Sequence, residues 1–148
     1  DTVLVEPRAF ASKETYDAAL IDVLQRYDVG LVCLAGFMRL LGASVVEAFP
    51  NRILNIHPSL LPAFPGLHGQ RQALRHGAKI TGATVHIVTS DLDAGPIVLQ
   101  APVSVEESDT TDTLSERILL EEHRIYPEAI GILLDGRWRI EGRRFLRS

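Results

Sequence analysis

A short apolar run between two glycines constrains the fold of this chain more than any other feature. Residues 31–35 read Leu-Val-Cys-Leu-Ala and lie between Gly30 and Gly36. Such a run is typical of a strand that is buried on both faces of a parallel sheet. A helical pattern precedes it, because apolar residues recur at three- and four-residue steps from Tyr16 to Tyr27, behind Ser12 as a capping residue. A helix followed by a buried strand predicts an α/β arrangement.

The rest of the chain continues this alternation. Further helices are predicted over residues 43–49, 70–76 and 112–134, with Pro127 kinking or restarting the last of them. Further strands are predicted over residues 1–6, 53–56, 83–88, 98–105, 138–140 and 144–146. We therefore predict one α/β domain over residues 1–148, with a parallel sheet core and antiparallel strands toward the C-terminus. Ligands of such sheets bind beyond the carboxyl ends of the strands, here in residues 36–41, 55–67 and 89–96.

Charge and cysteine content narrow the function classes. The net charge of −4 argues against broad nucleic-acid binding, and the arginines from Arg137 to Arg147 are interpreted as a solvated edge. Cys33 is the one cysteine, so no disulfide can form within the chain, and its apolar neighbours predict a small buried side chain. The apolar runs are too short to span a bilayer. We expect a cytoplasmic protein without membrane or nucleic-acid partners.

The end of the second apolar run holds the first candidates for chemistry. Asn55 and His57 are two residues apart, so their side chains point to the same face of a strand. An amide can hold a developing oxyanion while an imidazole, which titrates near neutrality, shuttles a proton, and this combination suits an acyl-type transfer. The alternative is that Asn55 caps a turn and that His57 is a hydrogen-bonded loop histidine.

A later loop, Asp91-Leu-Asp-Ala-Gly-Pro96, supplies a candidate carboxylate. Asp93 near an imidazole would favour the imidazolium and orient the ring, although an acidic residue in a Gly-Pro turn is often only a turn former. His86, on an alternating strand, is expected behind the reacting groups or in the core, and His76 is expected at a helix end. No histidine has metal-ligand spacing and a single cysteine provides no thiolate set, so we predict no catalytic metal.

Together these motifs resemble those of the folate-dependent formyltransferases. Asn-Ile-His-Pro-Ser-Leu-Leu-Pro at residues 55–62 is followed by Leu-Asp-Ala-Gly-Pro at residues 92–96, and Asn55 and Asp93 are 38 positions apart, as in that family. The stretches Pro-Gly-Leu-His at residues 65–68 and Arg-Gln-Ala-Leu at residues 71–74 are similar to its glycinamide ribonucleotide branch. The resemblance runs along the whole chain and implies a Rossmann-like formyltransferase sheet.

The resemblance implies a role for each matching residue. Asn55 would polarise the formyl oxygen, His57 would be the general acid and base, and Asp93 would keep His57 protonatable. The implied folate-binding residues are Lys13, Met38, Arg39, Leu40, Leu41, Asn55, Thr89, Ser90, Asp91, Leu92 and Asp93. Glu122 and His68 would contact the second substrate, which carries the amine.

Two departures from the family pattern affect these expectations. Lys13 stands where the family often has arginine; a lysine keeps the charge but loses the planar fork, and the alternative is an ordinary exposed helix residue. The chain reads as starting at the family's second strand, so the first strand–helix unit, with its glycine-rich turn for the substrate phosphate, is expected to be missing.

The implied reaction transfers the formyl group of 10-formyltetrahydrofolate to the amine of glycinamide ribonucleotide, a step of de novo purine synthesis. Formyl-folate would be a co-substrate, the expected partners are these two small molecules, and a homodimer is left open. Two alternatives are kept, namely a formyltransferase for a different amine and a folate-binding module without turnover.

Overall fold

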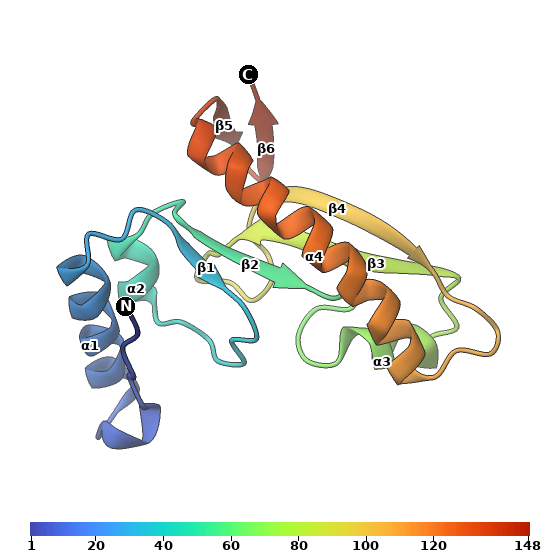
Figure 1. Cartoon of the computed structure of the whole chain (residues 1–148), viewed down its shortest axis with the longest axis horizontal. Helices are drawn as coiled ribbons and strands as arrows, with labels where there is room; N and C mark the ends of the chain where they lie inside the picture. The colour runs from blue at the N-terminus through green and yellow to red at the C-terminus, as the bar shows by residue number, and fades with distance from the viewer.

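One mixed sheet of six strands organises the chain, which a computed structural model describes over residues 1–148 (Figure 1). The strands are β1 (Val32–Leu34), β2 (Ile53–His57), β3 (Ile80–Ile87), β4 (Ile97–Ser104), β5 (Trp138–Glu141) and β6 (Arg144–Arg147). The helices are the 3-10 turn η1 (Pro7–Ala9) and the α-helices α1 (Lys13–Arg26), α2 (Ala43–Ala48), α3 (Gly69–Arg75) and α4 (Thr111–Asp135).

The strand order is β1-β2-β3-β4-β6-β5. Strands β1 and β2 are parallel, as are β4 and β6, whereas the pairs β2–β3, β3–β4 and β5–β6 are antiparallel. The predicted α/β class with parallel and antiparallel strands is confirmed. The antiparallel part already begins at β3, because the chain reverses direction between β2 and β3.

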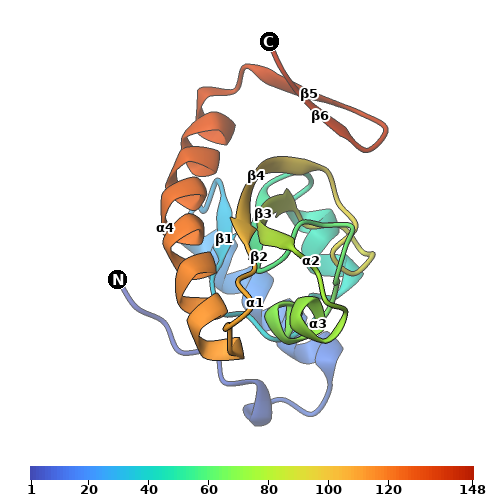
Figure 2. The same ribbon diagram turned by 90° about the vertical axis from the view of Figure 1, so that its right-hand side faces the viewer.

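Two apolar clusters cover the two faces of the sheet. Alternate residues of β3, such as Val85 and Ile87, are fully buried with Leu54 against the inner face of α4. Figure 2 shows α4 lying along this face, with the β5–β6 hairpin extending beyond it. Helices α1 and α2 pack on the opposite face of β1 and β2, around Val45 and Ile53. Asn55 and His57 share the face of Ile53 and therefore point away from α4.

The predicted helices form with the expected caps. The Ser12 side chain accepts a hydrogen bond from the Thr15 amide, as part of a reciprocal capping box that starts α1. Thr110 and Thr113 form the same arrangement at the start of α4. Of the kink or restart predicted at Pro127, the restart does not occur, because α4 is one helix over Thr111–Asp135. Because a proline has no amide hydrogen, Pro127 leaves the carbonyl of His123, one turn earlier, without a helical donor. Both residues are exposed, so water can solvate that carbonyl.

Two other predictions were wrong. Residues 1–6 are not a strand, because they pair with no strand of the sheet and are mostly exposed. Cys33 is exposed rather than buried. It shares a face with Leu54, but β1 is the edge strand and α4 packs mainly against β3 and β4. None of the helices has the length and the hydropathy that a membrane crossing would need.

Candidate active site

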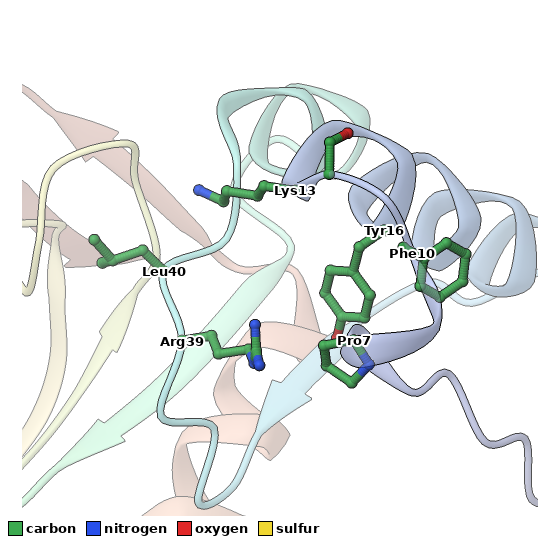
Figure 3. A pocket seen from close by; sticks show the side chains of 7 residues that line it. Pro7, Phe10, Lys13, Tyr16, Arg39 and Leu40 are labelled. Carbon is green, nitrogen blue, oxygen red and sulfur yellow. The ribbon is translucent and has the colours of Figure 1, made fainter.

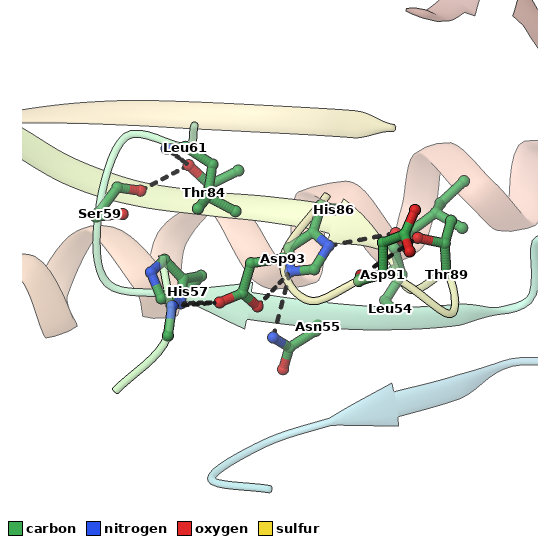
Figure 4. A network of polar contacts seen from close by, with 12 residues as sticks. Leu54, Asn55, His57, Ser59, Leu61, Thr84, His86, Thr89, Asp91 and Asp93 are labelled. Atoms are coloured by element: carbon green, nitrogen blue, oxygen red, sulfur yellow. Dashed lines mark hydrogen bonds and ion pairs between the residues drawn. The ribbon is translucent and has the colours of Figure 1, made fainter. Parts of the chain in front are cut away.

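The antiparallel pairing of β2 and β3 places four polar side chains on one face of the sheet. Asn55 lies opposite His86, and His57 lies opposite Thr84. Side chains of directly opposed residues point to the same face, and residues two apart on one strand do so as well. Register alone therefore brings these four together at the carboxyl end of β2 (Figure 4).

Asp93 joins this group from the loop between β3 and β4. Its carboxylate lies between the two imidazoles, with Oδ2 3.5 Å from His57 Nδ1 and Oδ1 3.7 Å from His86 Nε2. The Gly66 amide donates a hydrogen bond of 2.8 Å to Oδ2 and so ties this loop to the loop after β2. Asp93 adopts a left-handed backbone with φ of 49°, an uncommon conformation for a non-glycine residue. The predicted proximity of Asp93 to His57 is confirmed.

His86 is held neutral behind these groups. Burial lowers the pKa of His86, and the backbone hydrogen bond to Ile87 and the charge of Asp93 oppose this only in part. The ring contact identifies the tautomer of this neutral ring: Nδ1 lies 3.2 Å from the Ile87 carbonyl, which can only accept, so Nδ1 carries the proton. Nε2 then accepts from Asn55 Nδ2 at 3.3 Å. His86 thus occupies one of the two amide hydrogens of Asn55 and leaves the other for a ligand.

A buried polar network supports the loop that follows His57. Thr84 Oγ1 donates to the Ser59 carbonyl at 2.6 Å and accepts from the Leu61 amide at 3.1 Å. Gln100 Nε2 on β4 donates to Thr84 Oγ1 and to the Leu61 carbonyl. Sequence reasoning singled out none of Ser59, Thr84 and Gln100. The period of two along β3, with Thr84 two residues before His86, is the signal that could have found one of them.

The implied folate-binding residues divide between two places. Lys13, Arg39 and Leu40 line one cavity of about 570 Å³ between the N-terminal segment and the loop before α2 (Figure 3). Its other lining residues are Pro7, Phe10, Ser12 and Tyr16, which the sequence analysis did not assign to folate binding. Lys13 and Arg39 bring two cations to this cavity, which suits an anionic ligand group.

Of the other implied folate residues, Met38 and Leu41 lie on the same loop as Arg39 and Leu40, and residues 89–92 lie on the loop that carries Asp93. Met38 is 78% exposed and Leu92 is 53% exposed, whereas Leu41 is half-buried and packs against the Val45 cluster. Ser90 and Asp91 are exposed, and the Thr89 hydroxyl donates to the Asp91 carbonyl within the same loop. The two loops thus present apolar and polar side chains to solvent, and the second of them does so beside Asp93.

The two residues assigned to the second substrate lie apart from the hydrogen-bonded group. Glu122 is on α4, one turn before Tyr126, whose hydroxyl donates to the Leu34 carbonyl at 2.7 Å. Figure 1 shows α4 running antiparallel to β2, and Tyr126 also reaches the Leu54 carbonyl of that strand. The helical turn before Tyr126, which carries Glu122, therefore lies toward the carboxyl end of β2. Burial raises the pKa of Glu122. His68 is exposed, precedes α3 in a left-handed conformation and makes no capping hydrogen bond.

Comparison with known proteins identifies the family of this chain. The model of the formyl transferase family matches residues 1–130. The chain belongs to the formyl transferase family. It is 61% identical to a structure of glycinamide ribonucleotide transformylase 1 from Symbiobacterium toebii, with a TM-score of 0.94 over 96% of this chain and 67% of that one.

Curated relatives identify the branch. The chain is 48% identical to phosphoribosylglycinamide formyltransferase of Escherichia coli over 89% of its length, and 44% identical to that of Bacillus subtilis over 87%. It spans 62% and 66% of these two relatives, respectively. The glycinamide ribonucleotide branch predicted from the motifs is confirmed. No group of three or more histidine, cysteine or acidic residues is arranged to hold a metal ion.

Proposed function

We propose that this formyl transferase domain moves the formyl group of 10-formyltetrahydrofolate to the amine of glycinamide ribonucleotide. The observation that carries the proposal is the group of Asn55, His57, His86 and Asp93 at the carboxyl end of β2, in which both histidines are buried. An amide donor, an imidazole and a carboxylate are the groups that an acyl-type transfer between two amines requires.

The proposed chemistry follows from these positions. The amine nitrogen attacks the formyl carbon, and the C=O bond becomes a C–O⁻ that the free amide hydrogen of Asn55 stabilises. Collapse of this intermediate breaks the bond from the formyl carbon to N10 of the folate. The proton lost by the attacking amine passes through His57, Asp93 and water to N10, so protons and electrons balance.

The two cations of the large cavity support the folate as donor. Lys13 and Arg39 line it together with Phe10 and Tyr16, whose rings are 5.7 Å apart in an edge-to-face arrangement. A folate carries an aromatic ring and a carboxylate-bearing glutamate. We propose that the cavity takes this part of the molecule and that the residue 36–41 and 89–93 loops take the pterin. Glu122 and His68 are proposed contacts of glycinamide ribonucleotide.

Transfer is tested by following formyl-folate consumption together with formylation of glycinamide ribonucleotide. Formation of the formylated ribonucleotide by the parent chain, and its loss in His57→Ala, is the expected result. His76→Ala is the matched control, because His76 is an exposed histidine at the end of α3. Formylation of a different amine would point to another acceptor, and tight binding of a folate analogue without turnover would point to a binding module.

A further inference from the structure

We infer that Ser59 is a positioning residue that, through the carbonyl of Phe64, holds His57 as the Nε2–H tautomer and so makes Nδ1 its proton-exchanging nitrogen. The consequence for catalysis rests on the proposed function. The tautomer itself does not, because it is a property of the unliganded chain.

The protonated nitrogen follows from what His57 contacts. Nε2 lies 2.8 Å from the Phe64 carbonyl oxygen. A carbonyl has no hydrogen to give, so this short contact requires a hydrogen on Nε2. The other nitrogen, Nδ1, is 3.5 Å from Asp93 Oδ2. Nδ1 is therefore the nitrogen that gains and loses a proton beside the carboxylate, and Nε2 keeps its hydrogen throughout.

Ser59 contacts the same Phe64 carbonyl through its hydroxyl. Its hydroxyl lies 2.6 Å from the Ala63 carbonyl and 3.2 Å from the Phe64 carbonyl, to which it donates in a shared hydrogen bond. Phe64 has a φ of 53°, so its peptide is held in a left-handed conformation that a phenylalanine does not favour. The hydroxyl and the imidazole thus stabilise one carbonyl from two sides.

Ser59 is itself held rigidly enough to do this. It is fully buried, so water does not compete for its hydroxyl. Its amide donates to the His57 carbonyl at 2.9 Å, and its carbonyl accepts from Thr84 on β3 at 2.6 Å. The strand that carries His57 and the strand opposite it therefore both fix Ser59.

The test reads the tautomer directly by nitrogen-15 NMR of the histidine rings in the parent chain, with His57→Ala identifying the His57 signals. At a pH where His57 is neutral, we expect the pattern of an Nε2–H ring. In Ser59→Ala we expect a population of the Nδ1–H ring to appear. Ser115→Ala is the matched control, since the Ser115 hydroxyl also donates to a carbonyl at 2.6 Å, but on α4. An Nδ1–H ring in the parent, or an unchanged ring in Ser59→Ala, overturns the inference.

A kinetic measurement separates positioning from general damage. Ser59→Ala should lower kcat about tenfold while changing the KM for formyl-folate less than about twofold, because Ser59 belongs neither to the cavity at Lys13 nor to the loops assigned to the pterin. A parallel loss in Ser115→Ala, or an effect on KM alone, would contradict the inference. Should Ser59→Ala fail to fold, Ser59→Cys keeps a weak donor of similar size and is expected to show a smaller shift in the same direction. If the chain proves inactive, the NMR result still decides the tautomer.

Discussion

The group around His57 and the loop of residues 36–41 differ in how the protein holds them. The His57 and Asp93 side chains are 6% and 9% exposed; His57 stands on the face of the paired strands β2 and β3, and Asp93 reaches it from the loop after β3. Met38 and Leu40 are 78% and 59% exposed and lie on a loop at the edge strand. The groups assigned to chemistry are thus preorganised without ligand. The loop residues assigned to folate binding are instead exposed to solvent and would become covered when the folate binds. Substitutions should therefore affect turnover and stability in one region, and mainly affinity in the other.

The largest effect is expected at His57. His57→Ala removes the group assigned to proton transfer and should lower kcat by about 10²–10⁴-fold. Affinity for a folate analogue should change less than about threefold, because the cavity at Lys13 is unaffected. Steady-state kinetics and calorimetric titration check the two values. Turnover close to that of the parent would remove His57 from the mechanism.

Gly95 tests how firmly the Asp93 loop is attached to the sheet. A Cβ at Gly95 would overlap the backbone carbonyl of Ile87 at the end of β3, which cannot move without disturbing the sheet. Gly95→Ala should lower the free energy of unfolding by about 1–3 kcal/mol, measured by urea denaturation. Gly30→Ala is the control, because no atom lies within 4 Å of its added Cβ. Equal stability of the two variants would show that the loop adapts freely.

The buried His86, which lies behind His57, should make the free energy of unfolding of the protein depend on pH. Its pKa is lowered by burial from 6.5, so the unfolded chain binds the proton more readily than the folded one. The contribution of neutral His86 to the free energy of unfolding is thus fully present above about pH 6.5. As the pH decreases from there, this contribution is lost by at most about 1.4 kcal/mol per pH unit, until the pH reaches the pKa of His86 in the folded state.

His86→Gln removes this contribution, so its denaturation midpoint should depend less on pH between pH 7.5 and 5.5 than that of the parent. His76→Gln, at an exposed helix end, should behave like the parent. Parallel curves for parent and His86→Gln would mean that His86 is protonated equally in both states.

The smallest effect is expected in the open region, at Lys13. Lys13→Met keeps the length of the side chain and removes a charge that is exposed to solvent, so affinity for a folate analogue with a free glutamate should fall only about twofold to fivefold. The control is Lys79→Met, because Lys79 is exposed just before β3. The difference between the two variants should shrink in high salt. A loss that appears in kcat instead would contradict the division between the two regions.

The local pattern of the sequence determined much of this protein. Ser12 and the apolar steps after it specify α1, and the spacing of Asn55 and His57 specifies a shared face, because strand geometry repeats every two residues. The family motif supplied Asp93, which no local rule could place beside His57, since the chain must first return through β3.

Only the tertiary structure decided the rest. Cys33 lies in an apolar run but is exposed, because its strand, β1, is the edge strand of the sheet. The local sequence does not determine which strand takes that position. The alternating residues 1–6 are no strand, because a strand needs a partner to accept its hydrogen bonds. The Phe64 carbonyl and the Gly66 amide hold His57 and Asp93 in place through backbone atoms that every residue possesses. Their role comes from the folded path of the chain, which side-chain patterns do not encode.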